Sequence, residues 1–313
     1  MSTELPPTPP CLAWNRRIPN PFGYQPSLPA AIIFSAIFLG VLVTHSYQAY
    51  RFRKLWLITF VLGTLGELSG WVSRIGSHAC PYSVQSFEAQ LASLIMAPAF
   101  TTAGIYSILA LMIPVIGYDT SPLKPRLYLV IFLTVDFFSL LLQGIGGGMA
   151  GAAFSKKQDT TTATTIMVTG IIFQLGSTCV FATLYELVLY RGRNVLLRNR
   201  PLLILSSATL LSVTCMVIRG VYRSMELLQG WRGYLATNER FAIALEGSLM
   251  AISLITFNFF NPERLIREAR VVAAEIENQG FLTMELKRRD KVHKSGGDTT
   301  ALVAEVGGID ELR

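Results

Sequence analysis

Charged residues are scarce in this sequence of 313 residues, and their scarcity argues against an ordinary soluble fold. Asp, Glu, Lys and Arg make up 15% of the chain and hydrophobic residues 51%, whereas a soluble domain carries about 25% charged residues. The only histidines are His45, His78 and His293, spread over different loops and depths. An intramembrane metal hydrolase needs several converging ligands, so we expect neither a metal site nor an enzyme.

A phosphate-binding loop is also missing. No Gly-x-x-x-x-Gly-Lys-Ser/Thr sequence occurs anywhere in the chain. The backbone amides of such a loop would cradle the phosphates of ATP, so the chain does not hydrolyse ATP by that route. We expect no cofactor.

Seven long apolar runs dominate the sequence. They cover about residues 29–50, 55–75, 90–113, 127–150, 164–189, 202–222 and 241–260, each near the ~20 residues that an α-helix needs to cross a bilayer. The runs are continuous rather than alternating, which excludes a transmembrane β-barrel. The sequence therefore predicts an all-α polytopic membrane protein with a seven-helix bundle over residues 28–260.

The flanking segments have three different compositions. Residues 1–27 are rich in proline and contain no apolar core of a signal peptide. Residues 261–286 open with Asn261, Pro262 and Glu263, which suit an N-cap and first helical turn. The helically spaced apolar residues that follow, with arginines between them, predict an amphipathic helix on the inner leaflet, or else an extension of the last span. Residues 287–313 are highly charged and are predicted to be disordered.

Lys and Arg gather in alternate loops, and this sets the expected orientation. The loops after the first, third and fifth spans and the C-terminal segment hold most of them. Because cytoplasmic loops carry the basic excess, we predict an N-terminus outside and a C-terminus in the cytosol. The net charge of +7 then lies beside anionic membrane lipids, which makes nucleic acid an unsuitable partner.

The four cysteines divide by this topology. Cys179 and Cys215 fall inside spans, where a thiol serves as a small buried packing group. Cys11 and Cys80 both fall on the outer face, an oxidising location in which they could form a disulfide. The sequence leaves open whether they do.

Three carboxylates interrupt the apolar runs: Glu67, Asp136 and Glu246. An ionisable group near the middle of a bilayer costs about 2.5–3.5 kcal/mol on insertion scales, so it usually faces a bundle interior or a wet cavity. Further polar groups come from the same or other spans: Arg74, Gln143, Gln174 and Arg219. The alternative is that these groups only join helices through hydrogen bonds of about 0.6–2 kcal/mol each, which suits the two glutamines better than the acids.

Glycines occur in two pairs at a spacing of four residues. Gly66 with Gly70, and Gly144 with Gly148, predict places where helix backbones approach closely. Gly146, Gly147 and Gly148 together predict a loosened end of the fourth span, because glycine is costly in a helix.

Several short motifs occur in a fixed order from Tyr24 through the last span. They are Tyr24-x-Pro26-Ser27, Glu67-x-x-x-Trp71-x-x-Arg74, Ala97-Pro98 with Ala103 and Tyr106, Asp136 with Gln143, Gly170-x-x-x-Gln174, Arg219-x-x-Tyr222-Arg223-x-x-Glu226 with Gly230 and Gly233, and Glu239. Each motif is weak alone, but together they resemble the fungal RTA-like, or lipid-translocating exporter, family. The sequence departs from that family at three positions: Trp71 stands in place of a Tyr-like aromatic, Glu246 in place of Asp, and Asn261 in place of His before Pro262.

This resemblance implies a protein of the plasma membrane, or of the vacuole or another endomembrane, that exports or flips amphipathic lipid-like substrates. Sphingoid long-chain bases are the implied cargo, and resistance to them the implied effect. In that picture the three acids neutralise an ammonium head group, and Trp71, Tyr106 and Tyr222 add cation–π contacts.

A seven-helix receptor or lipid sensor without net transport is the alternative. Against it, the third span ends in Ile113-Pro114 and carries no Asp/Glu-Arg-Tyr motif.

Overall fold

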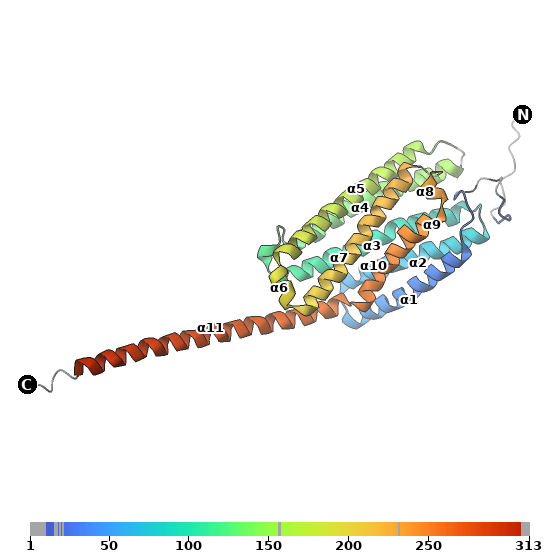
Figure 1. Ribbon diagram of the computed structural model, residues 1–313. Coiled ribbons are helices and arrows are strands. Elements are labelled where there is room, and N and C mark those ends of the chain that lie inside the picture. Colours follow the sequence, from blue (N-terminus) through green and yellow to red (C-terminus); the bar gives the residue numbers. More distant parts are fainter. Residues whose placement is uncertain are drawn as a thin grey trace, which may run out of the picture. The chain divides into compact units, whose positions relative to one another are not determined.

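The computed structural model describes residues 11–15, 18, 20, 22–155, 158–230 and 232–307. It divides into two units, Met1–Ile266 and Arg267–Arg313. All regular elements in the described residues are helical, and seven helices are long and apolar enough to cross a membrane (Figure 1). The predicted all-α bundle with seven spans is confirmed.

Each span covers all or nearly all of one predicted apolar run, and most spans extend past the run at both ends. At a rise of 1.5 Å per residue, helices of this length extend past a hydrocarbon core about 30 Å thick. The first six spans are α1 (Leu28–Phe52), α2 (Ile58–Ala79) after the short turn η1 (Leu55–Leu57), α3 (Val84–Ile116), α4 (Pro125–Ser155), α5 (Thr161–Arg191) and α7 (Arg200–Leu228).

The seventh span is not a regular α-helix throughout. It consists of α9 (Glu239–Phe241), the π-helical segment η3 (Ala242–Gly247) and α10 (Ser248–Phe259). Isolated π-helical turns are rare and often occur at functional sites. This one contains Glu246. Three short elements join the spans: η2 (Tyr118–Thr120), α6 (Arg193–Arg198) and α8 (Tyr234–Thr237).

Helix α3 lies at the centre of the bundle. In its most apolar stretch 78% of residues are buried, against 28% in α1 and in α4. It packs on α2, α4 and α7, while α1 packs on α2, α5 on α4 and α7, and α10 on α7. A helix that is apolar on all sides is stable when it is enclosed by others, which is the position that α3 occupies.

The predicted close contact at Gly66 and Gly70 is present. A Cβ atom on Gly66 would lie 2.9 Å from the Cβ of Ala97, and one on Gly70 would lie 2.5 Å from Cδ2 of Leu94. Helices α2 and α3 therefore approach so closely that a larger residue at either position would have to displace its neighbour.

The predictions for the glycines of the fourth span were wrong. Gly144 and Gly148 have no atom within 4 Å of an added Cβ, whereas Gly146 would place one 2.6 Å from the backbone nitrogen of Met167 in α5. Helix α4 also continues without a break to Ser155. Packing of this stretch against α5 compensates for the low helix propensity of glycine, which is about 1 kcal/mol per residue relative to alanine.

Cys11 and Cys80 form a disulfide. We call the end of the bundle where α2 ends at Ala79 and α3 begins at Val84 the disulfide end. The chain before α1 packs there, because Phe22 is buried and stacks edge-on against Phe87 with 5.0 Å between ring centroids. Cys215 is buried as predicted, but Cys179 is exposed, because it lies on a face of α5 that no neighbouring helix covers.

Helix α11 begins where the sequence predicted, with Asn261 as its cap, since the Asn261 side-chain oxygen accepts a hydrogen bond from the backbone N–H of Arg264 at 3.0 Å. The helix spans Pro262–Gly307. It thus continues past residue 286, where the sequence predicted that a helix would end and a disordered tail begin; residues 308–313 lie outside the described part. Lys, Arg, Glu and Ala, which favour helices, fill much of this stretch.

Candidate functional site

A lateral groove of about 670 Å³ lies between α3 and α4. All its lining residues come from these two helices, so it opens sideways from the bundle, where Met96, Phe137 and Leu141 are exposed. Its volume lies within the range of about 300–1,000 Å³ that is typical of ligand sites. The lining is Glu88, Leu91, Ala92, Ile95, Met96, Ala99, Phe100, Ala103, Leu133, Asp136, Phe137, Leu140, Leu141, Gln143, Gly144, Gly147 and Gly148.

The groove continues toward the disulfide end. A second cleft of about 690 Å³, formed by residues of α3, α4, α5 and α7 and of the chain that follows α7, shares Glu88, Leu91 and Gly147 with it. Gly147 and Gly148 keep the α4 side of the groove open, because side chains there would occupy it. This is the structural use of the glycine run in the fourth span.

Asp136 is the acid at the inner wall of the groove. Its residue is 3% exposed, and Oδ2 accepts hydrogen bonds from the hydroxyls of Thr102 at 3.1 Å and Tyr106 at 3.0 Å. Oδ1 has no hydrogen-bond partner, and no Lys, Arg or His among the described residues forms an ion pair with Asp136. One oxygen of the carboxylate thus has no partner among the described residues, although the residue lines the groove.

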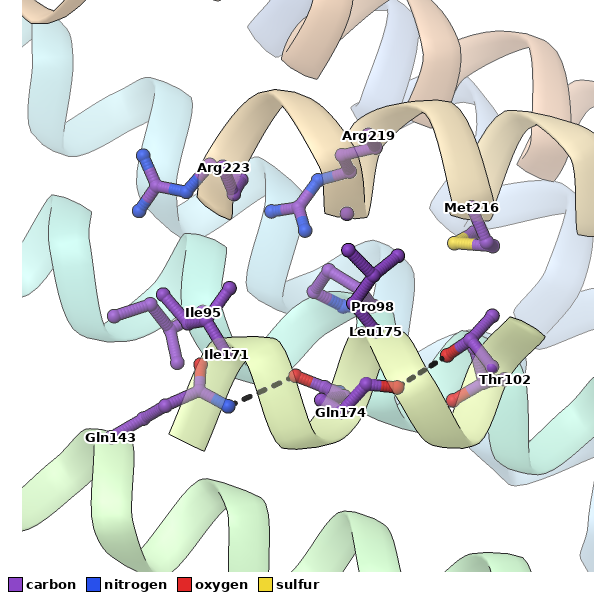
Figure 2. Close-up of a pocket in the computed structure, with 12 residues that line it drawn as sticks. Ile95, Pro98, Thr102, Gln143, Ile171, Gln174, Leu175, Met216, Arg219 and Arg223 are labelled. Atoms are coloured by element: carbon purple, nitrogen blue, oxygen red, sulfur yellow. Dashed lines mark hydrogen bonds between the residues drawn. The ribbon is translucent and has the colours of Figure 1, made fainter. Parts of the chain in front are cut away.

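Gln143 connects the groove to the bundle interior. Its side chain lines the groove and also a small cavity of about 40 Å³ between α3, α4, α5 and α7. Nε2 of Gln143 donates to Oε1 of Gln174 at 2.9 Å. Figure 2 shows this pair facing the guanidinium groups of Arg219 and Arg223 across the cavity.

Arg219 is held by a carbonyl that proline leaves free. Pro98 lies inside α3 and has no N–H to donate to the carbonyl oxygen four residues earlier, that of Leu94. This oxygen instead accepts a hydrogen bond from Nη2 of Arg219 at 2.6 Å. The Ala97-Pro98 motif therefore has a structural role, since it positions an arginine of α7 in the centre of the bundle.

Glu246 is neutralised within the protein. Its Oε1 lies 3.0 Å from Nη2 of Arg219 and 3.5 Å from Nε of Arg223. Arg223 also pairs with Glu226 at 2.6 Å, and the hydroxyl of Tyr222 donates to the same carboxylate at 3.1 Å. Tyr222 therefore bonds within α7, and Glu246 has two cations before any ligand arrives.

Glu67 is enclosed in the same region. It has no exposed surface, and neither carboxylate oxygen has a hydrogen-bond partner among the described residues. Arg219 and Glu246 are the charges that act on it most strongly. Trp71, one turn further along α2, stacks on Phe34 with 4.3 Å between ring centroids and lies beneath the guanidinium of Arg74. Its ring is thus occupied within the protein.

Arg74 fastens the chain before α1 to the disulfide end. Its Nη2 lies 2.8 Å from Oε1 of Glu239 and donates to the hydroxyl of Tyr24 at 2.6 Å. The same Glu239 oxygen accepts the backbone N–H of Ser27 at 2.8 Å. Burial raises the pKa of Tyr24, with the nearby Arg74 guanidinium acting in the opposite direction.

The predicted site residues therefore separate into groups. Asp136 and Gln143 line the lateral groove, Tyr106 bonds to Asp136 behind it, and Gln174 adjoins it through Gln143. A closed interior cluster contains Glu67, Trp71, Arg219 and Glu246, while Arg74 and Tyr222 bind other partners.

Sequence reasoning missed several residues at these places. Thr102 lies one turn before Tyr106 on α3, a helical spacing that could have revealed it. The spacing of Arg223 and Glu226 could likewise have suggested their ion pair. The pairing of Arg74 with Glu239, which are 165 positions apart, left no such local signal. Among the described residues no group of three or more His, Cys, Asp or Glu side chains could hold a metal ion.

Seven apolar spans with a carboxylate lining a groove in the side of the bundle define a polytopic membrane protein with a lateral polar site. The chain belongs to the family of RTA1 like proteins, whose sequence profile matches residues 60–269. This confirms the family that the motifs indicated.

Three relatives from Saccharomyces cerevisiae illustrate the relationship. The sphingoid long-chain base transporter RSB1 is 31% identical over 278 residues, which cover 77% of this chain and 72% of that protein. Protoporphyrin uptake protein 1 is 24% identical, covering 80% of this chain and 96% of the relative. Protein RTA1 is 24% identical, covering 79% and 88%. No solved structure matches the chain.

Proposed function

We propose that this protein moves amphipathic cations of the sphingoid long-chain base type across its membrane and so confers resistance to them. The observation that carries the proposal is the lateral groove with Asp136 at its inner wall. The relative named a sphingoid long-chain base transporter supports the choice of cargo.

The groove suits both parts of such a molecule. An ammonium group gains a charge-assisted hydrogen bond from the free Oδ1 of Asp136, while Thr102 and Tyr106 fix the other oxygen. The hydrocarbon tail packs against Leu140, Phe137 and the other apolar side chains of the groove.

The three acids then have different roles. Asp136 binds the head group, because it has an unpaired oxygen and lines the lateral groove. Glu246 is already paired with Arg219 and Arg223, so a cargo cation would have to displace a guanidinium to reach it. We therefore assign Glu246 and its arginines to holding α7 and the seventh span together.

The family resemblance supports the membrane location of the proposal, and the distribution of basic residues supports its orientation. We propose a plasma-membrane protein that is not an enzyme, with its N-terminus outside and its C-terminus in the cytosol. A C-terminal tag on intact cells should be inaccessible to a membrane-impermeant reagent. Labelling of that tag without permeabilisation would show that the orientation is the opposite one.

The function is tested by flux of a fluorescent sphingoid base in vesicles that contain only this protein. Asp136→Asn keeps the shape of the side chain but removes its charge, and should lower flux about 10-fold or more, the equivalent of one charge-assisted hydrogen bond. Asp119→Asn, at an exposed acid in η2, is the matched control and should transport normally. Equal flux through both variants would contradict the proposed site, and binding without any flux in the unmodified protein would favour a receptor or sensor.

A further inference from the structure

We propose that Asp136 alternately binds cargo and a proton, and that buried polar groups connect it to the disulfide end, so that the protein exchanges amphipathic cations against protons. The exchange rests on the proposed transport function. The proton path rests on two small cavities and the side chains that link them.

The first step of the path is competition at one carboxylate. Asp136 has one free oxygen and no ion pair among the described residues. From α3 the only titratable group facing it is Tyr106, from α5 the nearest polar groups are Gln174 and Thr178, and from α7 Arg219 and Arg223 lie beyond the small cavity. When the cargo leaves, a proton restores neutrality in a site where an unpaired charge is costly.

The second step leads from the groove into the interior. The cavity in Figure 2 has a volume of about 40 Å³ and is lined by Thr102, Gln143, Gln174, Thr178, Arg219 and Arg223, among others. Thr102 donates directly to Asp136, and Gln143 lines the groove as well. A buried water needs a site of this order and two to four polar partners, and these side chains offer them.

The third step continues toward the disulfide end. A cavity of about 60 Å³ is lined by Tyr24, Arg74, Gln90, Arg223, Glu226 and Glu246, together with apolar residues. Arg223 lines this cavity and the first one. Oε1 of Gln90 and Nη2 of Arg223 have no hydrogen-bond partner among the described residues. Polar groups therefore line both cavities, and Arg223, which they share, joins the one next to Asp136 to the one lined by Tyr24.

The buried charges that line these cavities or act on their lining residues are unequal in number. Four carboxylates, Glu67, Glu226, Glu239 and Glu246, accompany three guanidiniums, those of Arg74, Arg219 and Arg223. One carboxylate is left over, and among the described residues Glu67 is the member of the four without an ion pair. Glu67 lines neither cavity, but Arg219, which lines the first, is the charge that acts on it most strongly, so we assign Glu67 as the group that holds the transferred proton inside the bundle.

The path ends at the ion pair of Arg74 with Glu239. Tyr24 and Phe22 line the cavity beneath this pair, and the pair binds the chain just before α1. The polar groups around Tyr24 therefore close the path. Such groups can transfer protons but leave no opening for a lipid-like molecule. Bulky cargo is confined to the lateral groove.

The experiment uses vesicles that contain the full-length protein and an internal pH indicator. Adding a sphingoid base to the unmodified protein should change the internal pH, and an imposed pH gradient should accelerate cargo flux several-fold. Glu67→Gln and Gln174→Leu should each reduce the proton signal at least 5-fold, while both purified variants still bind the fluorescent base because Asp136 is intact. Gln85→Leu, at an exposed position in the first turn of α3, is the matched control.

The outcomes separate the two proposals. Cargo flux without any pH change or response to a gradient would overturn the exchange and leave the transport function standing. Absence of cargo flux in the unmodified protein would overturn the transport function itself. A proton signal that persists undiminished in both Glu67→Gln and Gln174→Leu would refute the path, while its loss in these two variants and not in Gln85→Leu would support it.

Discussion

The pairing of Glu246 with two arginines predicts that this acid serves stability rather than cargo binding. Glu246→Gln keeps the size of the side chain and removes the charge between Arg219 and Arg223, whose nitrogens lie 3.0 and 3.5 Å from its oxygen. Breaking a buried ion pair by removing one partner costs about 3–5 kcal/mol, because the remaining charge is left uncompensated. The variant should therefore unfold at a temperature lower by roughly 10 °C.

The buried thiol of Cys215 provides the assay. In a Cys179→Ala background Cys215 is the remaining free cysteine, since Cys11 and Cys80 are joined. A thiol-reactive fluorophore then reports unfolding of α7 in detergent. Glu186→Gln, at an exposed acid of α5, is the matched control and should melt like the parent.

A double-mutant cycle identifies the interaction itself. Arg219→Met combined with Glu246→Gln should be less destabilised than the sum of the single changes, with a coupling of about 1–3 kcal/mol. Additive effects, or a melting temperature of Glu246→Gln within about 2 °C of the parent, would refute the assignment and return Glu246 to the list of cargo-binding candidates.

Two further predictions concern packing and pH. Gly66→Ile should destabilise the bundle by about 1–3 kcal/mol because its Cβ would press on Ala97, whereas Gly148→Ile should melt like the parent but transport less because its side chain enters the groove. Thermal unfolding and cargo flux of both variants check this, and equal melting temperatures would contradict the packing. Burial raises the pKa of Tyr24 above its usual 10.0, so its contribution to stability is complete below about pH 10 and falls as the pH rises through the folded-state value. Tyr24→Phe should remove the part of the stability loss at alkaline pH that comes from this titration. An unchanged dependence of unfolding on pH would argue against this role of Tyr24.

The spans could be predicted from the sequence because length and continuous hydrophobicity decide whether a helix can cross a bilayer. The same signal does not say which helices are neighbours. Leu94 and Arg219 are 125 positions apart, and their contact depends on a carbonyl that Pro98 leaves free. No pattern of spacing in a single sequence encodes that meeting.

The burial of the three acids could also be predicted from the sequence, but their partners could not. The cost of a charge in the membrane identifies Glu67, Asp136 and Glu246 as inward-facing or functional, and all three are buried. Their chemistry does not reveal which of them has an arginine beside it. Asp136 and Glu246 are equivalent in the sequence argument, yet in the structure Asp136 accepts hydrogen bonds only from hydroxyls and Glu246 faces two guanidiniums.

The groove extends over only part of the bundle's length. Its residues on α3 run from Glu88 to Ala103, a rise of roughly 22 Å along a helix of about 50 Å. Beyond Asp136 an aromatic cluster closes the space between α3, α4 and α5: the ring of Tyr106 lies 5.3 Å from Phe132 and 4.6 Å from Phe181, and Phe132 lies 5.3 Å from Phe181. The site is thus accessible from the disulfide end and shut toward the other.

This asymmetry bears directly on the mechanism. A cation that reaches Asp136 from the disulfide end has no groove ahead of it, because Phe132 and Phe181 are 3% and 1% exposed. Passage through the remaining half of the membrane requires these rings to separate. Tyr106 is part of the aromatic cluster through its ring, and its hydroxyl donates a hydrogen bond to Asp136. If a bound cation replaces the hydrogen bond from the Tyr106 hydroxyl to Asp136, the ring of Tyr106 would be free to move. Head-group binding and opening of the far half would then be linked through this one side chain.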